Sequence, residues 1–252
     1  MRTADQRSLP LAYRFVVSVV RPLLRLLTKQ DWRGMENIPA TGGFVAVPNH
    51  LSHIDPLTFG HFMYDSGRPI FFLGKESVFR VPVIGWIVTK AQQIPVYRGT
   101  SQASDAYRAA VAAVRAGRPV GVYPEGSLTR DPDIWPMRGK TGAARIALET
   151  RSPVIPVAMW GPQELLAPYA KLPKLLPRKT MRITAGAPVD LTDLYDVPDQ
   201  RAAVAEATRR IMAALTSQLE TIRGEVAPVE RYDPAHHGQS EFGHPKDLPK
   251  AS

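Results

Sequence analysis

Short apolar runs alternate with helix-like segments along most of this chain, and this alternation is what most constrains its fold. Glycine or proline bounds most of the apolar runs, and their length and composition are typical of buried strands. The runs occupy residues 44–47, 70–73, 94–97, 120–123, 154–158 and 181–184. Helical segments are expected at residues 56–63, 101–116, 139–149 and 200–223. Strands that alternate with helices predict an α/β domain, with a largely parallel or mixed central sheet flanked by helices.

Length and composition indicate one globular domain with an anionic partner. The chain has 252 residues, 44% of them hydrophobic, which is enough for one sizeable core. It contains no cysteine, which excludes disulfides, thiolate metal ligands and a cysteine nucleophile. The formal net charge of +9 favours nucleic acid or an anionic membrane surface as a partner.

The two ends of the chain differ from the central domain, residues 31–224. Residues 1–30 predict a basic amphipathic helix, which either lies in a lipid interface or packs on the domain with a solvated basic stripe. Its cations, within a narrow sector of the helical wheel, are Arg14, Arg21, Arg25 and Lys29. The uncharged apolar run 15–20 is too short to span a bilayer and no signal-cleavage pattern occurs, so neither a transmembrane span nor secretion is expected. Residues 225–252 are rich in proline, histidine and charge and predict a mobile tail.

A histidine and an aspartate follow the first predicted strand. His50 lies just beyond residues 44–47, and Asp55 followed by Pro56 matches an N-cap residue and a proline in the first helical position. Residues five apart on one helix point about 140° away from each other, so the two side chains meet only if the chain turns between them. In such a corner Asp55 would hold one ring nitrogen of His50 and leave the other free to take a proton. The alternative is a helix cap beside a polar loop histidine.

Further candidate residues follow other predicted strands. A glycine-containing turn after residues 120–123 could bind an anion through its backbone N–H groups, and it carries Glu125, Gly126, Ser127 and, further on, Arg130. Cations near two other strand ends and before a helix are Lys75, Arg98 and Lys140. Ligands of open α/β sheets bind beyond the carboxyl ends of strands, so these residues are expected to line one cleft with His50. Taken singly, each is more often a loop residue or a surface ion pair.

In their order along the chain these blocks resemble the lysophosphatidic acid acyltransferase family, glycerolipid acyltransferases that share a His-x-x-x-x-Asp motif. Asn49 to Asp55 resembles the first motif, Lys75 through Gly85 to Arg98 the second, Tyr123 to Gly126 the third, and residues 154–157 the fourth. The resemblance spans roughly residues 43–160, and four blocks together are more specific than any one of them.

Two positions depart from the family pattern. The third motif usually reads Glu-Gly-Thr-Arg, whereas the first arginine after Gly126 in this chain is Arg130. Tyr97 stands where the second motif commonly has an acidic residue before its arginine.

The resemblance implies a single-domain glycerolipid-acyltransferase-like fold and a corresponding reaction. A fatty acyl group would move from a thioester to the free hydroxyl of a lysophospholipid such as lysophosphatidic acid, making phosphatidic acid in phospholipid biosynthesis. His50 would be the general base and Asp55 its orienter. The acceptor would be held by Lys75, Arg98, Glu125, Gly126, Ser127, Arg130 and Lys140. No metal or cofactor is implied beyond the thioester co-substrate, acyl-CoA or acyl-carrier protein.

A lipid acceptor places the expected enzyme at a membrane. We expect a peripheral protein on the cytoplasmic face of the cell membrane, with the anionic membrane surface as its partner and residues 1–30 in the interface. A second basic and apolar patch combines Lys171, Lys174, Arg178, Lys179 and Arg182 with Leu172, Leu175 and Leu176. A solvated loop is the alternative for that patch.

Two other functions fit parts of the sequence. His50, His53 and Asp55 could ligate a metal in a hydrolase, although, apart from His61, the remaining histidines lie in the predicted tail. The net charge suggests a nucleic-acid-binding protein, but no recognisable binding motif accompanies it. No nucleic-acid partner is therefore expected.

Overall fold

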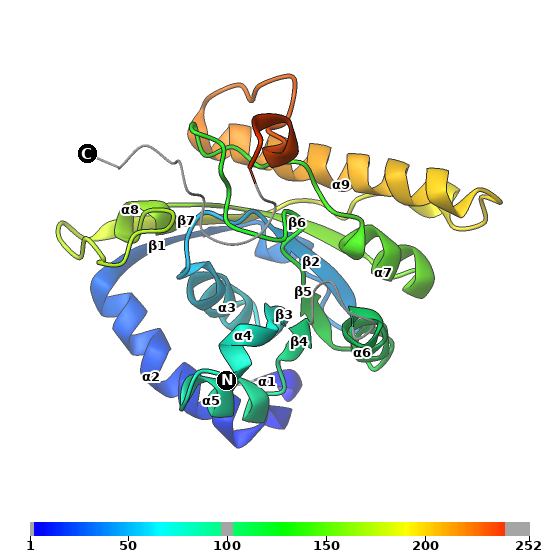
Figure 1. Cartoon of the computed structure of the whole chain (residues 1–252). Helices are drawn as coiled ribbons and strands as arrows, with labels where there is room; N and C mark the ends of the chain where they lie inside the picture. Colours follow the sequence, from blue (N-terminus) through cyan, green and yellow to red (C-terminus); the bar gives the residue numbers. More distant parts are fainter. Residues whose placement is uncertain (1–2, 97–102, 240–252) are drawn as a thin grey trace.

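A mixed β-sheet is the framework of the protein, which the computed structural model describes over residues 3–96 and 103–239 (Figure 1). In this part of the chain the sheet has seven strands, in the order β1-β7-β6-β2-β5-β3-β4. β6 and β7 pair antiparallel, and the other neighbours pair parallel. The strands are β1 Thr28–Arg33, β2 Phe44–Pro48, β3 Phe71–Lys75, β4 Ile94–Val96, β5 Pro119–Gly121, β6 Val154–Trp160 and β7 Lys179–Ala185. The predicted α/β fold with a mixed sheet flanked by helices is confirmed.

Helices cover both faces of the sheet because the central strands are apolar on both sides. In β2, Val45 and Val47 face a core shared with α6, α7 and α9, whereas Phe44 and Ala46 face a core shared with α3. The α-helices are α1 Ala4–Ser8, α2 Leu11–Leu27, α3 Asp55–Asp65, α4 Glu76–Phe79, α5 Ile84–Lys90, α6 Ala103–Arg115, α7 Gly142–Thr150, α8 Pro162–Leu165 and α9 Gln200–Arg223. Short 3-10 helices are η1 Met35–Asn37, η2 Thr192–Leu194 and η3 Pro234–His237.

One strand was not predicted. β1 is polar along most of its length and lies at the edge of the sheet, where it pairs with β7. An edge strand needs no apolar run, since only part of it is buried. The single helix expected over residues 1–30 is two helices, α1 and α2; the second ends at Leu27, and residues 28–30 belong to the sheet.

Helix α2 packs one side on the domain and exposes an apolar stripe on the other. On the packed side, the Tyr13 hydroxyl donates to the Ile70 carbonyl at 3.0 Å, and Leu24 is buried. The exposed stripe consists of Leu11, Phe15, Val19, Leu23 and Leu26. The packing alternative thus holds for one side of the helix, and a position in a lipid interface stays a prediction for the exposed side. Within the described residues, no helix combines the length and apolar character needed to cross a bilayer.

Two of the helix cations are held by the domain. Nε of Arg21 donates to Oδ1 of Asp65 at 2.7 Å, and Arg25 lies 3.6 Å from Oδ2 of the same residue. Trp32 and His61 also contact this carboxylate, at 3.2 Å each. Asp65 at the end of α3 therefore anchors α2, and Arg21 and Arg25 are not a simple solvated stripe.

The first part of the expected C-terminal tail packs on the domain. The backbone N–H of Arg138 donates to the Tyr232 carbonyl at 3.0 Å, and the Arg138 guanidinium pairs with Asp233 at 2.9 Å. Residues 240–252 lie outside the described part of the chain. The domain thus continues past Gly224, the C-cap of α9.

Candidate active site

The corner between β2 and α3 is pinned to the neighbouring strand. The side-chain amide of Asn49 donates to the Met159 carbonyl at 3.0 Å and accepts from the Met159 N–H at 2.7 Å. Met159 lies next to the carboxyl end of β6, where the bend after β2 would leave its backbone N–H and carbonyl unpaired. The two hydrogen bonds from Asn49 satisfy both of these groups. The chain therefore leaves the sheet at a defined angle just before His50.

Asp55 gathers three donors from the corner on one carboxylate oxygen. Oδ2 lies 2.9 Å from Nδ1 of His50 and accepts the backbone N–H groups of Leu51 and Ser52 at 2.5 and 2.8 Å. The sequence predicted Asp55 as the N-cap, but the N-cap is Ile54 and Asp55 is the first helical residue. Its side chain reaches back over the corner and does not cap its own helix. The predicted contact between His50 and Asp55 is present.

This geometry gives the imidazole a defined proton arrangement. The Asp55 side chain is fully buried, and that of His50 is 17% exposed. An ionised carboxylate accepts only, so Nδ1 of His50 carries the hydrogen and Nε2 is left with a free lone pair. A partly exposed, oriented imidazole of this kind can take a proton from a ligand hydroxyl.

Glu125 lies inside the protein and ties two loops together. Its oxygens accept the backbone N–H of His50 at 2.9 Å and that of Met137 at 3.0 Å. The residue is 2% exposed, and burial raises its pKa to about 8, although the two backbone hydrogen bonds oppose that shift. Both oxygens are thus used to hold the His50 corner against the loop that follows the third motif.

The rest of the predicted turn lies at the surface of the site. Gly126 has a φ of 73°, in the region that favours glycine. A Cβ atom there would lie 3.1 Å from Cδ and Cε of Lys140, so the lysine stem packs against the turn. The backbone N–H of Lys140 also donates to the Pro124 carbonyl at 2.7 Å. Ser127, half-buried, belongs to the same turn.

The remaining predicted cations are placed differently from one another. Lys75 is exposed at the end of β3. Arg130 is only 1% exposed, so its side chain is an interior group. Its burial agrees with the departure from the family motif. Arg98 lies outside the described residues, as does Tyr97.

The structure adds Tyr123, which the sequence analysis did not assign to the site. Its ring stacks on the imidazole of His50, with centroids 4.1 Å apart and planes at 26°. The hydroxyl is buried without a hydrogen-bond partner in the described structure, and burial, then the nearby Asp55 charge, raise its pKa well above the usual value. Only its position before the Pro-Glu-Gly turn could have signalled a role, and the stacking itself depends on the packing of β2 beside β5.

The alternative metal site has no ligand set in the described residues. His53 is exposed and its ring meets that of Tyr169 edge-on, at 6.3 Å between centroids. His61 is buried beside Asp65 at the far end of α3. No group of three His, Cys, Asp or Glu side chains suited to a metal occurs in residues 3–96 and 103–239.

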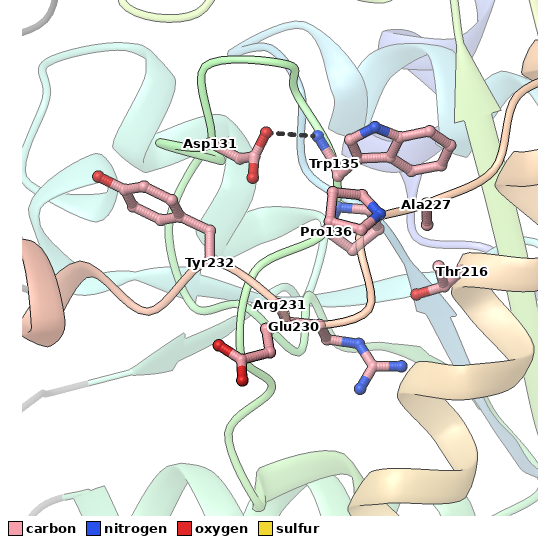
Figure 2. Close-up of a pocket in the computed structure, with 9 residues that line it drawn as sticks. Asp131, Trp135, Pro136, Thr216, Ala227, Glu230, Arg231 and Tyr232 are labelled. Carbon is pink, nitrogen blue, oxygen red and sulfur yellow. Dashed lines mark hydrogen bonds between the residues drawn. The ribbon is translucent and has the colours of Figure 1, made fainter.

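A small hollow also opens on another part of the protein (Figure 2). It lies between the loop that contains Trp135, helix α9 and the C-terminal segment around Tyr232. None of the predicted site residues that the structure describes lines it. We assign it no part in the chemistry of His50.

The fold and the corner define an α/β protein with an oriented histidine at the carboxyl edge of its sheet. A sequence model of the family described as Acyltransferase matches residues 29–160, just over half of the chain. The chain therefore belongs to this acyltransferase family, and the resemblance found in its motifs is confirmed.

Individual relatives agree with this family. A 1-acyl-sn-glycerol-3-phosphate acyltransferase of Bacillus subtilis is 26% identical over 212 residues, which cover 83% of this chain and 100% of that protein. A chloroplastic 1-acyl-sn-glycerol-3-phosphate acyltransferase of Brassica napus is 31% identical over 55% of this chain and 39% of that protein. A protein of the same name from Borreliella burgdorferi is 30% identical over 50% of this chain and 49% of that protein. The match thus spans less than half the length of the latter two.

A solved structure shares the fold. The crystal structure of the 1-acyl-sn-glycerophosphate acyltransferase PlsC from Thermotoga maritima superimposes with a TM-score of 0.65 at 21% identity. The match covers 90% of this chain and 86% of that one.

Proposed function

We propose that the protein transfers a fatty acyl group from a thioester donor to the free hydroxyl of a lysophospholipid such as lysophosphatidic acid. The donor would be acyl-CoA or acyl-carrier protein, and the product phosphatidic acid. The observation that carries the proposal is the 2.9 Å contact between Nδ1 of His50 and Oδ2 of Asp55. It leaves Nε2 as the free base at the edge of the sheet.

The proposed reaction needs no acyl-enzyme intermediate. Nε2 of His50 takes the proton of the acceptor hydroxyl while the oxygen of that hydroxyl attacks the thioester carbonyl. The carbon–sulfur bond then breaks, the ester remains on the acceptor, and the imidazolium returns its proton to the leaving thiolate. Asp55 stabilises the transient imidazolium through the hydrogen bond at Nδ1. Ser52 takes no covalent part, since its hydroxyl donates to the Leu166 carbonyl at 2.6 Å.

The phosphate of the acceptor would bind on the side of the third-motif turn. The backbone N–H of Ser127 would donate to the anion, since that of Gly126 already donates to the Tyr123 carbonyl at 3.1 Å, and Lys140 lies against this turn. Lys75 and Arg98 would add further cations, as lysine and arginine do at phosphate sites. We assign Glu125 and Arg130 to holding the loops, because both are buried.

A membrane location follows from the acceptor. Moving about 15 methylenes from a bilayer into water costs roughly 12 kcal/mol at about 0.8 kcal/mol each, so free solution is a poor route for such a lipid. The exposed apolar stripe of α2 supports a peripheral position at the cytoplasmic face of the cell membrane.

A transfer assay with purified protein, both thioester types and a panel of lysolipid acceptors tests the proposal. His50→Ala should lower turnover by roughly 10² to 10⁴ while the fold is retained. His53→Ala is the matched control, because His53 has no role in the proposed reaction and this variant should keep the transfer activity. Equal loss in both variants, together with inhibition by a chelator, would instead favour the metal-dependent hydrolase. Binding to DNA in preference to anionic vesicles would favour the nucleic-acid alternative.

A further inference from the structure

The loop between α8 and β7 exposes three leucines to solvent. We call residues 171–178 the leucine loop; all eight of its residues are exposed. Leu172 and Leu176 are each 82% exposed, and Leu175 is 43% exposed. Single exposed leucines are ordinary, but a cluster on one loop marks an interaction surface.

The charge of this loop has one sign. Lys171, Lys174 and Arg178 alternate with the leucines, and Lys179 and Arg182 follow in β7. No acidic residue occurs between Glu164 and Asp190. A partner must therefore combine negative charge with an apolar phase, as an anionic bilayer does.

The leucine loop is joined to the end of helix α2. The Arg178 guanidinium donates to the carbonyls of Arg25 and Thr28, at 2.7 Å each. It thereby satisfies carbonyls at the C-terminus of α2, where a cation is favourable. Figure 1 shows α2 running past the sheet to β1, near the place where the loop after α8 projects. The exposed apolar stripe of α2 ends at Leu26, so the two apolar surfaces are neighbours.

The base of the same loop is joined to the candidate active site. The hydroxyl of Ser52, which is two residues after His50, donates to the Leu166 carbonyl at 2.6 Å. The Tyr169 hydroxyl donates to the Leu128 carbonyl at 3.2 Å, in the loop that follows Glu125. The loop therefore connects the helix that carries the apolar stripe with the corner that carries the histidine.

We propose that the leucine loop is a second membrane contact, separate from α2, that binds anionic lipid bilayers. Leu172 and Leu176 enter the acyl region, while Lys171 and Lys174 stay at the headgroups and bind lipid phosphates. Two contacts define the tilt of the domain on the bilayer, whereas α2 alone would allow rotation about its own axis. The tilt turns the His50 corner toward the interface, and this consequence rests on the proposed acyl transfer.

An acidic carrier protein is the other macromolecule that a basic surface could attract. The bilayer is favoured because Arg178 joins the leucine loop to the end of α2 and because both surfaces are apolar. Carrier-protein binding without insertion into lipid is therefore an outcome that would overturn the proposal.

The absence of cysteine from the sequence allows a clean test in the full chain. Leu176→Cys, labelled with an environment-sensitive fluorophore, reports the polarity at the loop tip. The matched control is Val229→Cys, because Val229 is an aliphatic residue at least as exposed as Leu176 and lies beyond α9. Phosphatidylcholine vesicles with and without phosphatidylglycerol are the probe, and sedimentation measures bound protein in parallel.

With anionic vesicles, the Leu176 label should shift to the blue and be quenched by spin-labelled lipid, and the Val229 label should do neither. Lys171→Gln combined with Lys174→Gln should weaken binding to anionic vesicles roughly 30-fold and leave binding to phosphatidylcholine alone unchanged. The proposal is wrong if the Leu176 label keeps its aqueous spectrum while the protein sediments with vesicles. It is also wrong if the label responds to acyl-carrier protein and not to vesicles.

A separate measurement distinguishes this proposal from the proposed enzyme function. Leu172→Ser combined with Leu176→Ser should lower transfer to a vesicle-embedded acceptor about tenfold or more and leave transfer to a short-chain, water-soluble acceptor unchanged. An equal loss with both acceptors would assign the leucines to folding or catalysis and overturn the membrane contact. If the wild-type protein transfers to neither acceptor, the enzyme proposal fails while the fluorescence result still decides the contact.

Discussion

Replacing Asp55 with asparagine tests whether the carboxylate acts through the imidazole. The side chain is fully buried, and its Oδ2 receives the Nδ1 hydrogen of His50 together with two backbone N–H groups. A neutral amide oxygen would keep the backbone donors, which lie at 2.5 and 2.8 Å, in preference to the imidazole at 2.9 Å. The corner should therefore survive while the histidine loses its charged partner.

The size of the effect follows from that lost partner. A hydrogen bond to a charged group contributes about 1.5–3 kcal/mol, which corresponds to roughly 10- to 150-fold in rate. Loss of the defined tautomer adds to this, so we expect Asp55→Asn to lower kcat about 10²-fold or more. The assay is steady-state transfer from a thioester to a lysolipid, with circular dichroism as the check on folding.

The double variant, Asp55→Asn combined with His50→Ala, shows whether Asp55 acts through His50. In a His50→Ala background, Asp55→Asn should change kcat by less than about threefold, because the carboxylate has no imidazole left to orient. If the two losses multiply in the double variant, Asp55 acts independently of His50 and the reasoning fails.

Three further predictions concern other polar side chains of the domain. Glu125→Gln should change the pH dependence of the free energy of unfolding. Because the pKa of Glu125 is raised to about 8, its carboxyl stabilises the fold fully below pH 4.5 and loses this stabilisation as pH rises to about 8. In urea unfolding, the difference in free energy between the wild type and the variant should shrink from pH 5 to 8, and a constant difference would contradict the raised pKa. Tyr123→Phe should retain activity and raise the free energy of unfolding by about 1 kcal/mol, because it removes an unpaired buried hydroxyl. Tyr123→Ala should instead lower kcat, because it removes the ring that stacks on His50. A large loss of kcat in the phenylalanine variant would show that the hydroxyl itself is needed. Asp65→Asn should destabilise the protein by about 1–3 kcal/mol at pH 7. Burial raises the pKa of the Asp65 carboxyl, but contacts from His61, Arg21 and Trp32 outweigh this effect and hold the pKa well below its usual range. The stabilisation by the carboxylate is therefore present above pH 4 and is lost in stronger acid. Thermal unfolding at neutral and acid pH measures it, and an equal difference at both would contradict the assignment.

Much of the fold could be predicted because its central strands are apolar and short. The runs at 44–47 and 154–158 fall in β2 and β6, and helix α9 has its predicted bounds, Gln200–Arg223. β1 was missed because a polar edge strand has no periodic apolar signal. The exposed stripe of α2 could not be separated from its buried side, since both carry large apolar side chains and only the packing partner distinguishes them.

The sequence by itself determined the class of fold and the acyltransferase motifs, because these depend on local patterns. It named His50 and Asp55 as candidates, but their contact needed the turn that only the structure shows. Tertiary structure alone decided what each buried polar group does. It places Glu125 between the His50 and Met137 backbones, encloses Arg130 in the interior and stacks Tyr123 on the imidazole. These contacts join loops that follow different strands, or depend on how the strands pack. Their distances are set by strand order and register, which a linear pattern does not contain.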